Sequence, residues 1–184
     1  HDELLFEIAD DILKKAMPHL RMPELAKKIK PAASKAKALS LAKKLKNKIV
    51  LAYAPTEYGF LAHDWKVRFN ETAKTPSFTA LMPELNHNEI AGFQTKRFGK
   101  EVFVLFLQDS KQDAKMKKRI KLTKRLLSGY NVGSEVITLS GATKLEKAFN
   151  GILFAEWASY YLAKANGVDP YDTELIEKFK KLMK

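Results

Sequence analysis

The spacing of apolar residues along the chain changes between two periods, and this change separates predicted strands from predicted helices. Short runs rich in apolar and β-branched residues are too short for core helices and are typical of strands buried in a parallel sheet. They comprise residues 49–54, 102–107 and 135–139, with a weaker candidate at 77–81.

Helical spacing predicts the elements around these runs. In residues 3–16, for example, Leu4, Ile8 and Ile12 share one face, and Pro18 ends the segment. Gly129 and Gly167 occupy positions where helix C-terminal caps belong. Further helices are predicted at residues 23–30, 34–46, 57–73, 112–127, 142–165 and 172–183, with Pro31 as an interruption.

Alternating strands and helices imply right-handed crossovers and a parallel sheet that is covered on both faces. The expected fold class is therefore α/β. We expect a three-layer α/β/α domain with a mostly parallel sheet over residues 47–184, preceded by a helical N-terminal lead-in over residues 1–46. Ligands of such sheets bind beyond the carboxyl ends of the strands, so the loops of interest follow Ala54, Leu81, Leu107 and Leu139.

Composition limits the class of protein. A chain of 184 residues fits one ordinary domain, and a hydrophobic content of 46% supports a core and excludes global disorder. The absence of cysteine excludes disulfides, thiolate nucleophiles and cysteine-ligated zinc. No signal peptide is visible, and the longest apolar run is far shorter than the roughly 20 residues of a membrane-spanning helix. We expect a cytoplasmic protein without membrane association.

The net charge of +12 suggests an anionic partner. Ten basic residues against one acidic residue lie between Arg21 and Lys48, and eight against one lie between Lys111 and Arg125. A nucleic-acid-binding α/β domain is one interpretation. Because these lysines follow predicted helices and no nucleic-acid-binding motif accompanies them, solvated helix faces are favoured and nucleic acid is not an expected partner.

Residues 70–89 carry the most unusual chemistry, because carboxylates, a histidine and three amide side chains occur together there. Asparagine competes with the backbone for hydrogen bonds, so the run Asn86-His87-Asn88 is a poor helix or strand. Either a polar turn that satisfies its own side chains or a functional site would explain it. A carboxylate and an imidazole suit proton transfer.

Cofactor motifs are absent from the sequence. The histidines have no metal-binding spacing such as HxH or HExxH, and no glycine-rich phosphate-binding loop follows any predicted strand. We therefore expect neither a metal nor an organic cofactor. The four histidines are His1, His19, His63 and His87.

Several runs of residues resemble the second sugar-isomerase (SIS) domain of the bifunctional phosphoglucose/phosphomannose isomerases of archaea and some bacteria. They are Trp65-Lys66-x-x-x-Asn70-Glu71-x-x-Lys74-x-Pro76-x-Phe78, Pro83-Glu84-Leu85-Asn86-His87-Asn88-Glu89-Ile90, Ala158-Ser159-x-Tyr161-Leu162-Ala163 and Gly167-Val168-Asp169-Pro170. The resemblance covers most of residues 48–184. It implies an SIS-type fold and isomerisation of glucose 6-phosphate or mannose 6-phosphate to fructose 6-phosphate.

The resemblance also implies roles for single residues. Glu71 falls where the family has its catalytic base, which moves a proton between C1 and C2 through a cis-enediolate. His87 falls where the family has the histidine that opens the sugar ring from the partner subunit, which implies a homodimer. A carboxylate tuned by partial burial suits the base, and the neutral amides of Asn70 and Asn88 suit binding of the substrate.

Thr173 and Lys180 match two further substrate-binding positions of the family by spacing. One is the small residue that leaves room for either C2 epimer, and the other is a lysine near the ring oxygen. Ser159 and Lys164 are the alternatives for these positions. Thr72 departs from the family pattern, where asparagine is expected.

Other residues of these runs have ordinary structural interpretations. Trp65 and Trp157 are predicted to pack in the core, and surface or cap roles are predicted for Glu84 and Glu89.

In this family the phosphate is bound by serine- and threonine-rich loops of the first SIS domain, and no such loop follows a strand here. The chain begins with His1 and not with a methionine. We therefore expect the N-terminal SIS domain to be absent from this chain, which alone would bind hexose 6-phosphate poorly and would not isomerise it. A non-catalytic, SIS-type sugar-phosphate-binding regulatory domain is the alternative.

Overall fold

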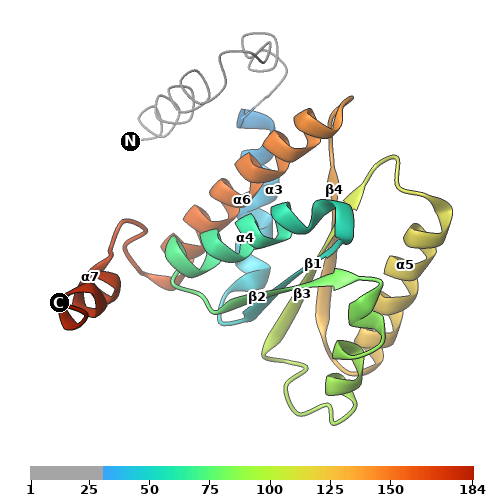
Figure 1. Ribbon diagram of the computed structural model, residues 1–184, viewed down its shortest axis with the longest axis horizontal. Coiled ribbons are helices and arrows are strands. Elements are labelled where there is room, and N and C mark those ends of the chain that lie inside the picture. Colours follow the sequence, from blue (N-terminus) through green and yellow to red (C-terminus); the bar gives the residue numbers. More distant parts are fainter. Residues whose placement is uncertain (1–30) are drawn as a thin grey trace.

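A computed structural model describes residues 31–184, so the helices predicted at residues 3–16 and 23–30 lie outside the described residues. The elements follow one another as in Figure 1. They are α3 (Pro31–Leu45), β1 (Ile49–Pro55), η1 (Thr56–Tyr58), α4 (Gly59–Glu71), β2 (Ser77–Met82), η2 (Glu84–Asn86), η3 (Glu89–Phe93), β3 (Val102–Asp109), α5 (Ala114–Gly129), β4 (Gly133–Leu139), α6 (Lys144–Asn166) and α7 (Glu174–Leu182).

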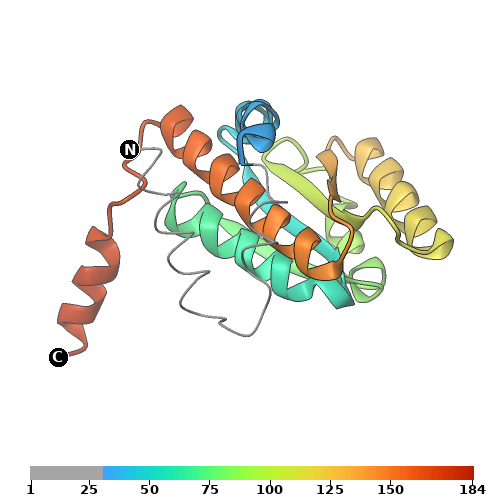
Figure 2. The same cartoon turned by 90° about the horizontal axis from the view of Figure 1, so that it is seen from above.

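The four strands form one parallel sheet in the order β2-β1-β3-β4. In its register Leu51 of β1 lies opposite Phe78 of β2 and Val104 of β3. All strands therefore end at the same carboxyl edge and begin at the same amino edge. The predicted α/β class with three layers is confirmed, since α3, α4 and α6 cover one face and α5 covers the other (Figure 2).

The larger core lies between the sheet and the helices α3, α4 and α6. Val50, Ala52 and Leu105 point from the strands into it and are fully buried. Leu41 and Leu45 of α3 pack into the same core, so the helix predicted at residues 34–46 is part of the packed body. Burial of such side chains, at roughly 1.5–3 kcal/mol each, is the main force that holds this layer.

Two tryptophans fill the layer of helices, as their predicted packing role requires. Trp65 is fully buried, and its indole Nε1 donates to the carbonyl oxygen of Gly151 at 3.1 Å, which joins α4 to α6. Trp157 is 4% exposed and stacks on Tyr161 with ring centroids 5.8 Å apart. The packing role of both residues is confirmed.

The smaller core lies on the other face of the sheet. Tyr53, Val104 and Phe106 pack there against Ile120 and Leu127 of α5. Between β2 and β3 the chain forms only the short turns η2 and η3, and not a second long helix. This face is consequently thinly covered near the edge strand β2.

The predicted boundaries are close to those of the structure. Each predicted strand differs by at most two residues, and the weak candidate at 77–81 is the edge strand β2. Pro31 is the first residue of α3, and the interruption predicted there stays a prediction because residues 23–30 lie outside the described residues. Gly167 has φ +70° and caps α6 as predicted, whereas the cap of α5 is Tyr130, one residue beyond Gly129.

The C-terminal helix α7 has no buried residue and projects from the body of the domain (Figures 1 and 2). Within residues 31–184 no helix has the length and apolar character needed to cross a membrane.

Candidate active site

Glu71 is the last residue of α4, at the amino edge of the sheet, and its side chain is exposed. Its backbone carbonyl accepts a hydrogen bond from Lys74 Nζ. In the described part of the chain no hydrogen bond or ion pair engages its carboxylate. The carboxylate is thus free to contact a substrate. Residues 31–184 leave it exposed, although partial burial is expected of the catalytic base.

A cavity of about 370 Å³ opens at the amino edge, and Glu71 is not among the residues that line it. Lys74 and Thr75 from the turn after α4 line it together with Asn166 from the end of α6. Asn166 Nδ2 donates to Thr75 Oγ1 at 3.1 Å, which fixes the end of α6 against this turn. Amide, hydroxyl and ammonium groups suit the hydroxyl groups of a sugar.

Asn70, which was predicted to bind substrate, uses its amide on the neighbouring backbone. Asn70 Oδ1 accepts from the Ser77 amide at 2.9 Å, and Nδ2 donates to the Ser77 carbonyl at 3.2 Å. The side chain therefore replaces a strand partner at the start of β2.

The run Asn86-His87-Asn88 follows β2 at the carboxyl edge. Asn86 Nδ2 donates to Thr123 Oγ1 at 2.7 Å and Asn86 Oδ1 accepts from Arg119 Nη1 at 3.1 Å, so this residue ties the loop to α5. Asn88 Oδ1 accepts from the Glu89 amide at 2.6 Å and caps η3. A polar turn satisfied by its own side chains thus accounts for both asparagines.

His87 is the member of this run that the turn does not explain. Its backbone amide donates to the Glu84 carbonyl at 2.8 Å, while its side chain is exposed. Among the residues that the structure describes, none forms a hydrogen bond or ion pair with the imidazole. The imidazole is therefore available to another molecule.

Glu71 and His87 do not come together within one chain. The whole of β2 lies between them, with Glu71 before its amino end and His87 beyond its carboxyl end. Six residues of strand at about 3.3 Å each separate the two edges by roughly 20 Å. One hexose cannot contact both side chains of one copy.

Thr173 and Lys180 lie on the projecting helix α7. Thr173 is its N-cap residue without a side-chain capping bond, and Lys180 Nζ donates to Glu177 Oε1 at 2.6 Å. Because α6 ends against Thr75, the chain leaves for α7 from the same edge that carries Glu71 (Figure 1).

The two alternatives to these positions are placed differently. Ser159 is fully buried and donates to the Glu156 carbonyl at 3.0 Å. Lys164 lies 5.5 Å from the ring of Tyr160 on the surface of α6. Ser159 therefore has no access to a ligand in this chain, while Lys164 has.

The carboxyl edge holds a polar cluster that the sequence did not predict. Asp109 ends β3 and accepts hydrogen bonds from the Tyr58 hydroxyl, from Lys147 Nζ at 2.5 Å and from the Lys111 amide at 2.7 Å. Burial alone would raise the pKa of Asp109, but these donors lower it to about 2. Burial and the bond to Asp109 raise the pKa of Tyr58.

This cluster lies between the ends of β1 and β3, where a parallel sheet usually binds its ligand. The polar groups of this cluster form hydrogen bonds with one another. Nearby, Gln112 Nε2 donates to Glu57 Oε1 at 2.8 Å. The loops after Ala54 and Leu107 are therefore joined by their own side chains. In the sequence, this cluster was indicated by the position of Asp109, two residues after the end of the strand predicted at residues 102–107.

Residues 34–183 match the model of the family described as "Bacterial phospho-glucose isomerase C-terminal SIS domain". The chain belongs to this family. The SIS-type fold and the family predicted from the sequence are thereby confirmed.

The relatives of this SIS domain include proteins named bifunctional phosphoglucose/phosphomannose isomerase. The one from Thermoplasma volcanium is 34% identical over 134 residues, which cover 72% of this chain and 42% of that protein. The one from Aquifex aeolicus is 27% identical over 150 residues, which cover 82% of this chain and 47% of that protein. The SIS domain thus spans about half the length of the relatives that it matches.

Solved structures support the fold. A glucose-6-phosphate isomerase like protein from Thermus thermophilus superposes with a TM-score of 0.62 at 24% identity, over 78% of this chain and 46% of that one. Glucosamine-6-phosphate deaminase from Thermotoga maritima superposes with a TM-score of 0.59 at 18% identity, over 82% and 46%. At these identities the likeness establishes the SIS fold alone.

Proposed function

We propose that this SIS domain is the C-terminal half of a cytoplasmic hexose 6-phosphate isomerase, which interconverts glucose 6-phosphate or mannose 6-phosphate with fructose 6-phosphate. The observation that carries the proposal is the exposed carboxylate of Glu71 at the amino edge, which no described residue engages, in a chain of this family.

Glu71 is the base of the proposed reaction. Its carboxylate takes the proton from C2 of the open-chain aldose, the C2 electron pair forms the cis-enediolate double bond, and the carbonyl oxygen at C1 takes a proton. Return of the carbon-bound proton to C1, with loss of the hydroxyl proton at O2, gives the ketose without net oxidation. The C2 proton is only weakly acidic, so contact and orientation provide much of the acceleration.

The second copy of the chain supplies His87 in this proposal. The separation of Glu71 from His87 by β2 supports action in trans, because a partner can bring its carboxyl-edge loop to the amino-edge cavity. The imidazole then donates and accepts protons at the ring oxygen and the anomeric hydroxyl during opening. Thr173 and Lys180 complete the site from α7 when this helix closes over it.

The phosphate group is bound by the other SIS half, in keeping with the half-length coverage of the relatives. The isolated domain is then expected to bind fructose 6-phosphate weakly and to leave it unchanged. Normal turnover by the isolated domain would refute the proposal that the other SIS half has to bind the phosphate group.

Mixing two inactive variants tests the proposal in the full-length polypeptide. Glu71→Gln and His87→Asn are each expected to lower kcat by at least about 1000-fold, since each removes a proton-transfer group. In an equal mixture half of the dimers are hybrids with one intact site, so roughly a quarter of the wild-type activity returns. A mixture as inactive as its components contradicts action in trans, and an active Glu71→Gln variant contradicts the base.

A further inference from the structure

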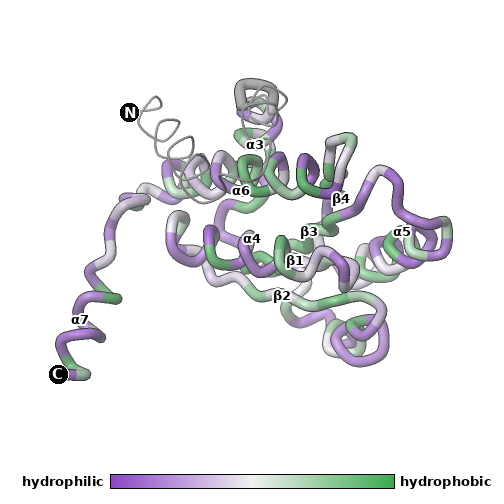
Figure 3. Tube along the Cα trace, turned by 45° about the horizontal axis from the view of Figure 1, so that its top comes forward, coloured by the Kyte–Doolittle hydropathy of each residue, from purple (hydrophilic) through white to green (hydrophobic). Residues whose placement is uncertain are grey.

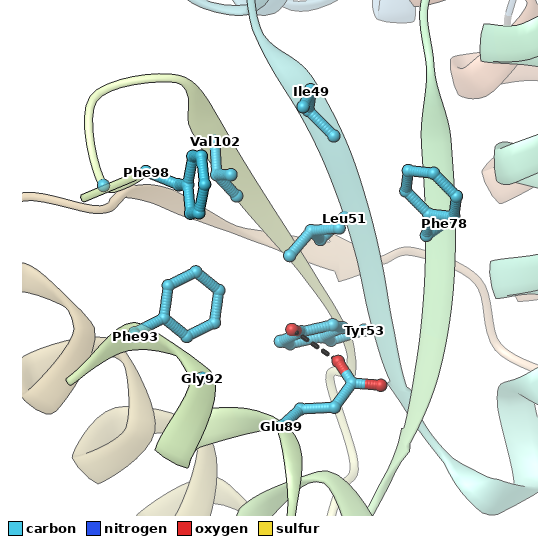
Figure 4. A pocket seen from close by; sticks show the side chains of 10 residues that line it. Ile49, Leu51, Tyr53, Phe78, Glu89, Gly92, Phe93, Phe98 and Val102 are labelled. Atoms are coloured by element: carbon cyan, nitrogen blue, oxygen red, sulfur yellow. Dashed lines mark hydrogen bonds between the residues drawn. The ribbon is translucent and has the colours of Figure 1, made fainter. Parts of the chain in front are cut away.

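The turn that carries His87 is anchored on both sides of this residue. Beyond β2 the chain changes from apolar to hydrophilic (Figure 3). Before His87, the amide of Asn86 is hydrogen-bonded to α5. After it, Glu89 Oε2 accepts a hydrogen bond from the hydroxyl of Tyr53 at 2.7 Å (Figure 4). His87 therefore lies between one anchor on α5 and one on β1.

Tyr53 is a rigid donor for the second anchor. Its side chain comes from the middle of β1, is 1% exposed and packs edge-on against Phe106, with ring centroids 5.9 Å apart. A buried hydroxyl group needs a hydrogen-bond partner, and here that partner is the Glu89 carboxylate. Burial and this hydrogen bond raise the pKa of Tyr53, so the phenol keeps the proton that it donates.

The carboxylate of Glu89 stands at the wall of an apolar cavity of about 320 Å³ on the α5 face of the sheet. Figure 4 shows the rings of Phe78, Phe93 and Phe98 around this cavity. An ionised carboxylate beside apolar side chains needs a donor, and among residues 31–184 only Tyr53 donates to it. Glu89 is exposed, as a surface role predicts, but its carboxylate has a defined position. Because the cavity leaves room for this side chain to move, the hydrogen bond and not packing fixes it.

The place of the His87 imidazole depends on these anchors. The side chain is exposed, and no group in the described part of the chain forms a hydrogen bond with it. A proton donor acts only within hydrogen-bond reach of the accepting atom, and a misplacement of about 1 Å can cost roughly 100-fold in rate. Since no bond orients the imidazole itself, the backbone of the turn has to set its place.

We propose that the Tyr53–Glu89 hydrogen bond positions His87 for opening of the sugar ring. Tyr53 and Glu89 are positioning residues that do not touch the sugar. The sheet holds Tyr53, Tyr53 holds the first residue of η3, and η3 holds the turn that carries His87 two residues earlier. During opening the C1–O5 bond breaks, one proton arrives at O5 and one leaves O1, and the imidazole carries both. This role of the pair rests on the proposed function.

Exchange between the α and β anomers separates ring opening from the rest of the reaction. A ring that opens and closes again gives either anomer, and this needs no proton transfer at carbon. In the full-length polypeptide with Glu71→Gln, isomerisation is expected to stop, so exchange between the anomers of glucose 6-phosphate, measured by NMR, reports ring opening alone. Adding His87→Asn to this polypeptide is expected to abolish the catalysed exchange.

Changes to the anchoring pair are then added to the Glu71→Gln polypeptide. Tyr53→Phe and Glu89→Ala are each expected to slow the catalysed exchange about 10-fold. The two changes together are expected to do no more than either one, because both remove the same hydrogen bond. Glu89→Gln keeps an acceptor for the Tyr53 hydroxyl and is expected to retain at least about half of the rate. Tyr130→Phe is the matched control, since this ring packs on the same face of the sheet and no described residue bonds its hydroxyl.

Binding and folding separate positioning from damage to the site. Circular dichroism checks the fold, and the Kd of glucose 6-phosphate is expected to change less than about twofold in each variant, because the pair does not touch the sugar. Unchanged exchange in Tyr53→Phe and Glu89→Ala overturns the positioning role while the proposed reaction stands. Equal losses in Glu89→Gln and Glu89→Ala, or a loss confined to Kd, overturn it as well. A Glu71→Gln polypeptide that does not accelerate the exchange contradicts ring opening by His87 itself, and the positioning role with it.

Discussion

Lys147 Nζ lies 2.5 Å from Asp109 Oδ1, with the two side chains only 5% and 15% exposed. Through this pair, α6 is anchored to the end of β3, and the Tyr58 hydroxyl adds the end of η1 to the same carboxylate. The carboxyl edge, where a ligand was expected from the fold class, is therefore held by a network of its own side chains. The candidate site lies at the opposite, amino edge.

The stability of the domain is predicted to depend on the ionisation of Asp109. Its folded-state pKa of about 2 lies below the ordinary 3.8, so the carboxylate stabilises the fold above about pH 4 and loses that contribution as the pH falls to about 2. The shift corresponds to about 2 kcal/mol. Asp109→Asn leaves buried Lys147 without an anion and is expected to cost roughly 3 kcal/mol at pH 6.

Urea unfolding at several pH values checks this prediction. The difference between the wild type and Asp109→Asn is expected to shrink by about 2 kcal/mol between pH 5 and pH 2. Glu135→Gln, which breaks the exposed ion pair of Glu135 with Lys44, is the control and is expected to change stability by less than about 0.5 kcal/mol. A constant difference across this pH range would contradict the role assigned to Asp109.

Two glycines of the segment between β2 and β3 are predicted to respond in opposite ways to alanine. A Cβ atom at Gly99 would overlap the carbonyl oxygen of Tyr130, so the backbone has to move, at a cost of roughly 2 kcal/mol. A Cβ atom at Gly92 meets nothing within 4 Å. Gly92→Ala is therefore expected to be neutral or to stabilise by up to about 1 kcal/mol. Equal melting temperatures for the two variants would argue against the close approach of Gly99 and Tyr130.

Asn70 is predicted to stabilise the start of β2. Asn70→Ala leaves the Ser77 amide without its acceptor and is expected to cost about 1–3 kcal/mol in unfolding free energy. Asn70→Asp keeps this acceptor but loses the donor to the Ser77 carbonyl, so an intermediate loss is expected at neutral pH. Because a protonated carboxyl group can donate again, this loss is expected to decrease in acid. A change in KM without any change in stability would instead favour the substrate-binding role.

The sequence predicted the layers of the fold because local patterns determine them. The apolar run at residues 102–107 is typical of a strand that is buried on both faces of a sheet. The spacing of apolar residues in residues 142–165 is typical of a helix that covers one face of such a sheet. The role of Asn86 could not be predicted from the sequence, since its partner Thr123 lies 37 positions away and is brought close only by packing. Asn88 accepts from the amide of the next residue, which is a local turn contact of the kind that the sequence did suggest. The Asp109–Lys147 pair joins residues 38 positions apart and leaves no local pattern.

Lys180 is predicted to contribute to the reaction of the full-length polypeptide, and Lys181 is not. The two lysines are adjacent on α7, but Lys180 borders the apolar face, four residues after Ile176, whereas Lys181 lies on the polar side. A charged hydrogen bond to the sugar is worth about 1.5–3 kcal/mol, so Lys180→Gln is expected to lower kcat/KM by roughly 10–100-fold. Lys181→Gln removes the same charge and is expected to stay within about twofold. Equal losses in both variants would show that α7 contributes only its positive charge, which added salt would then screen.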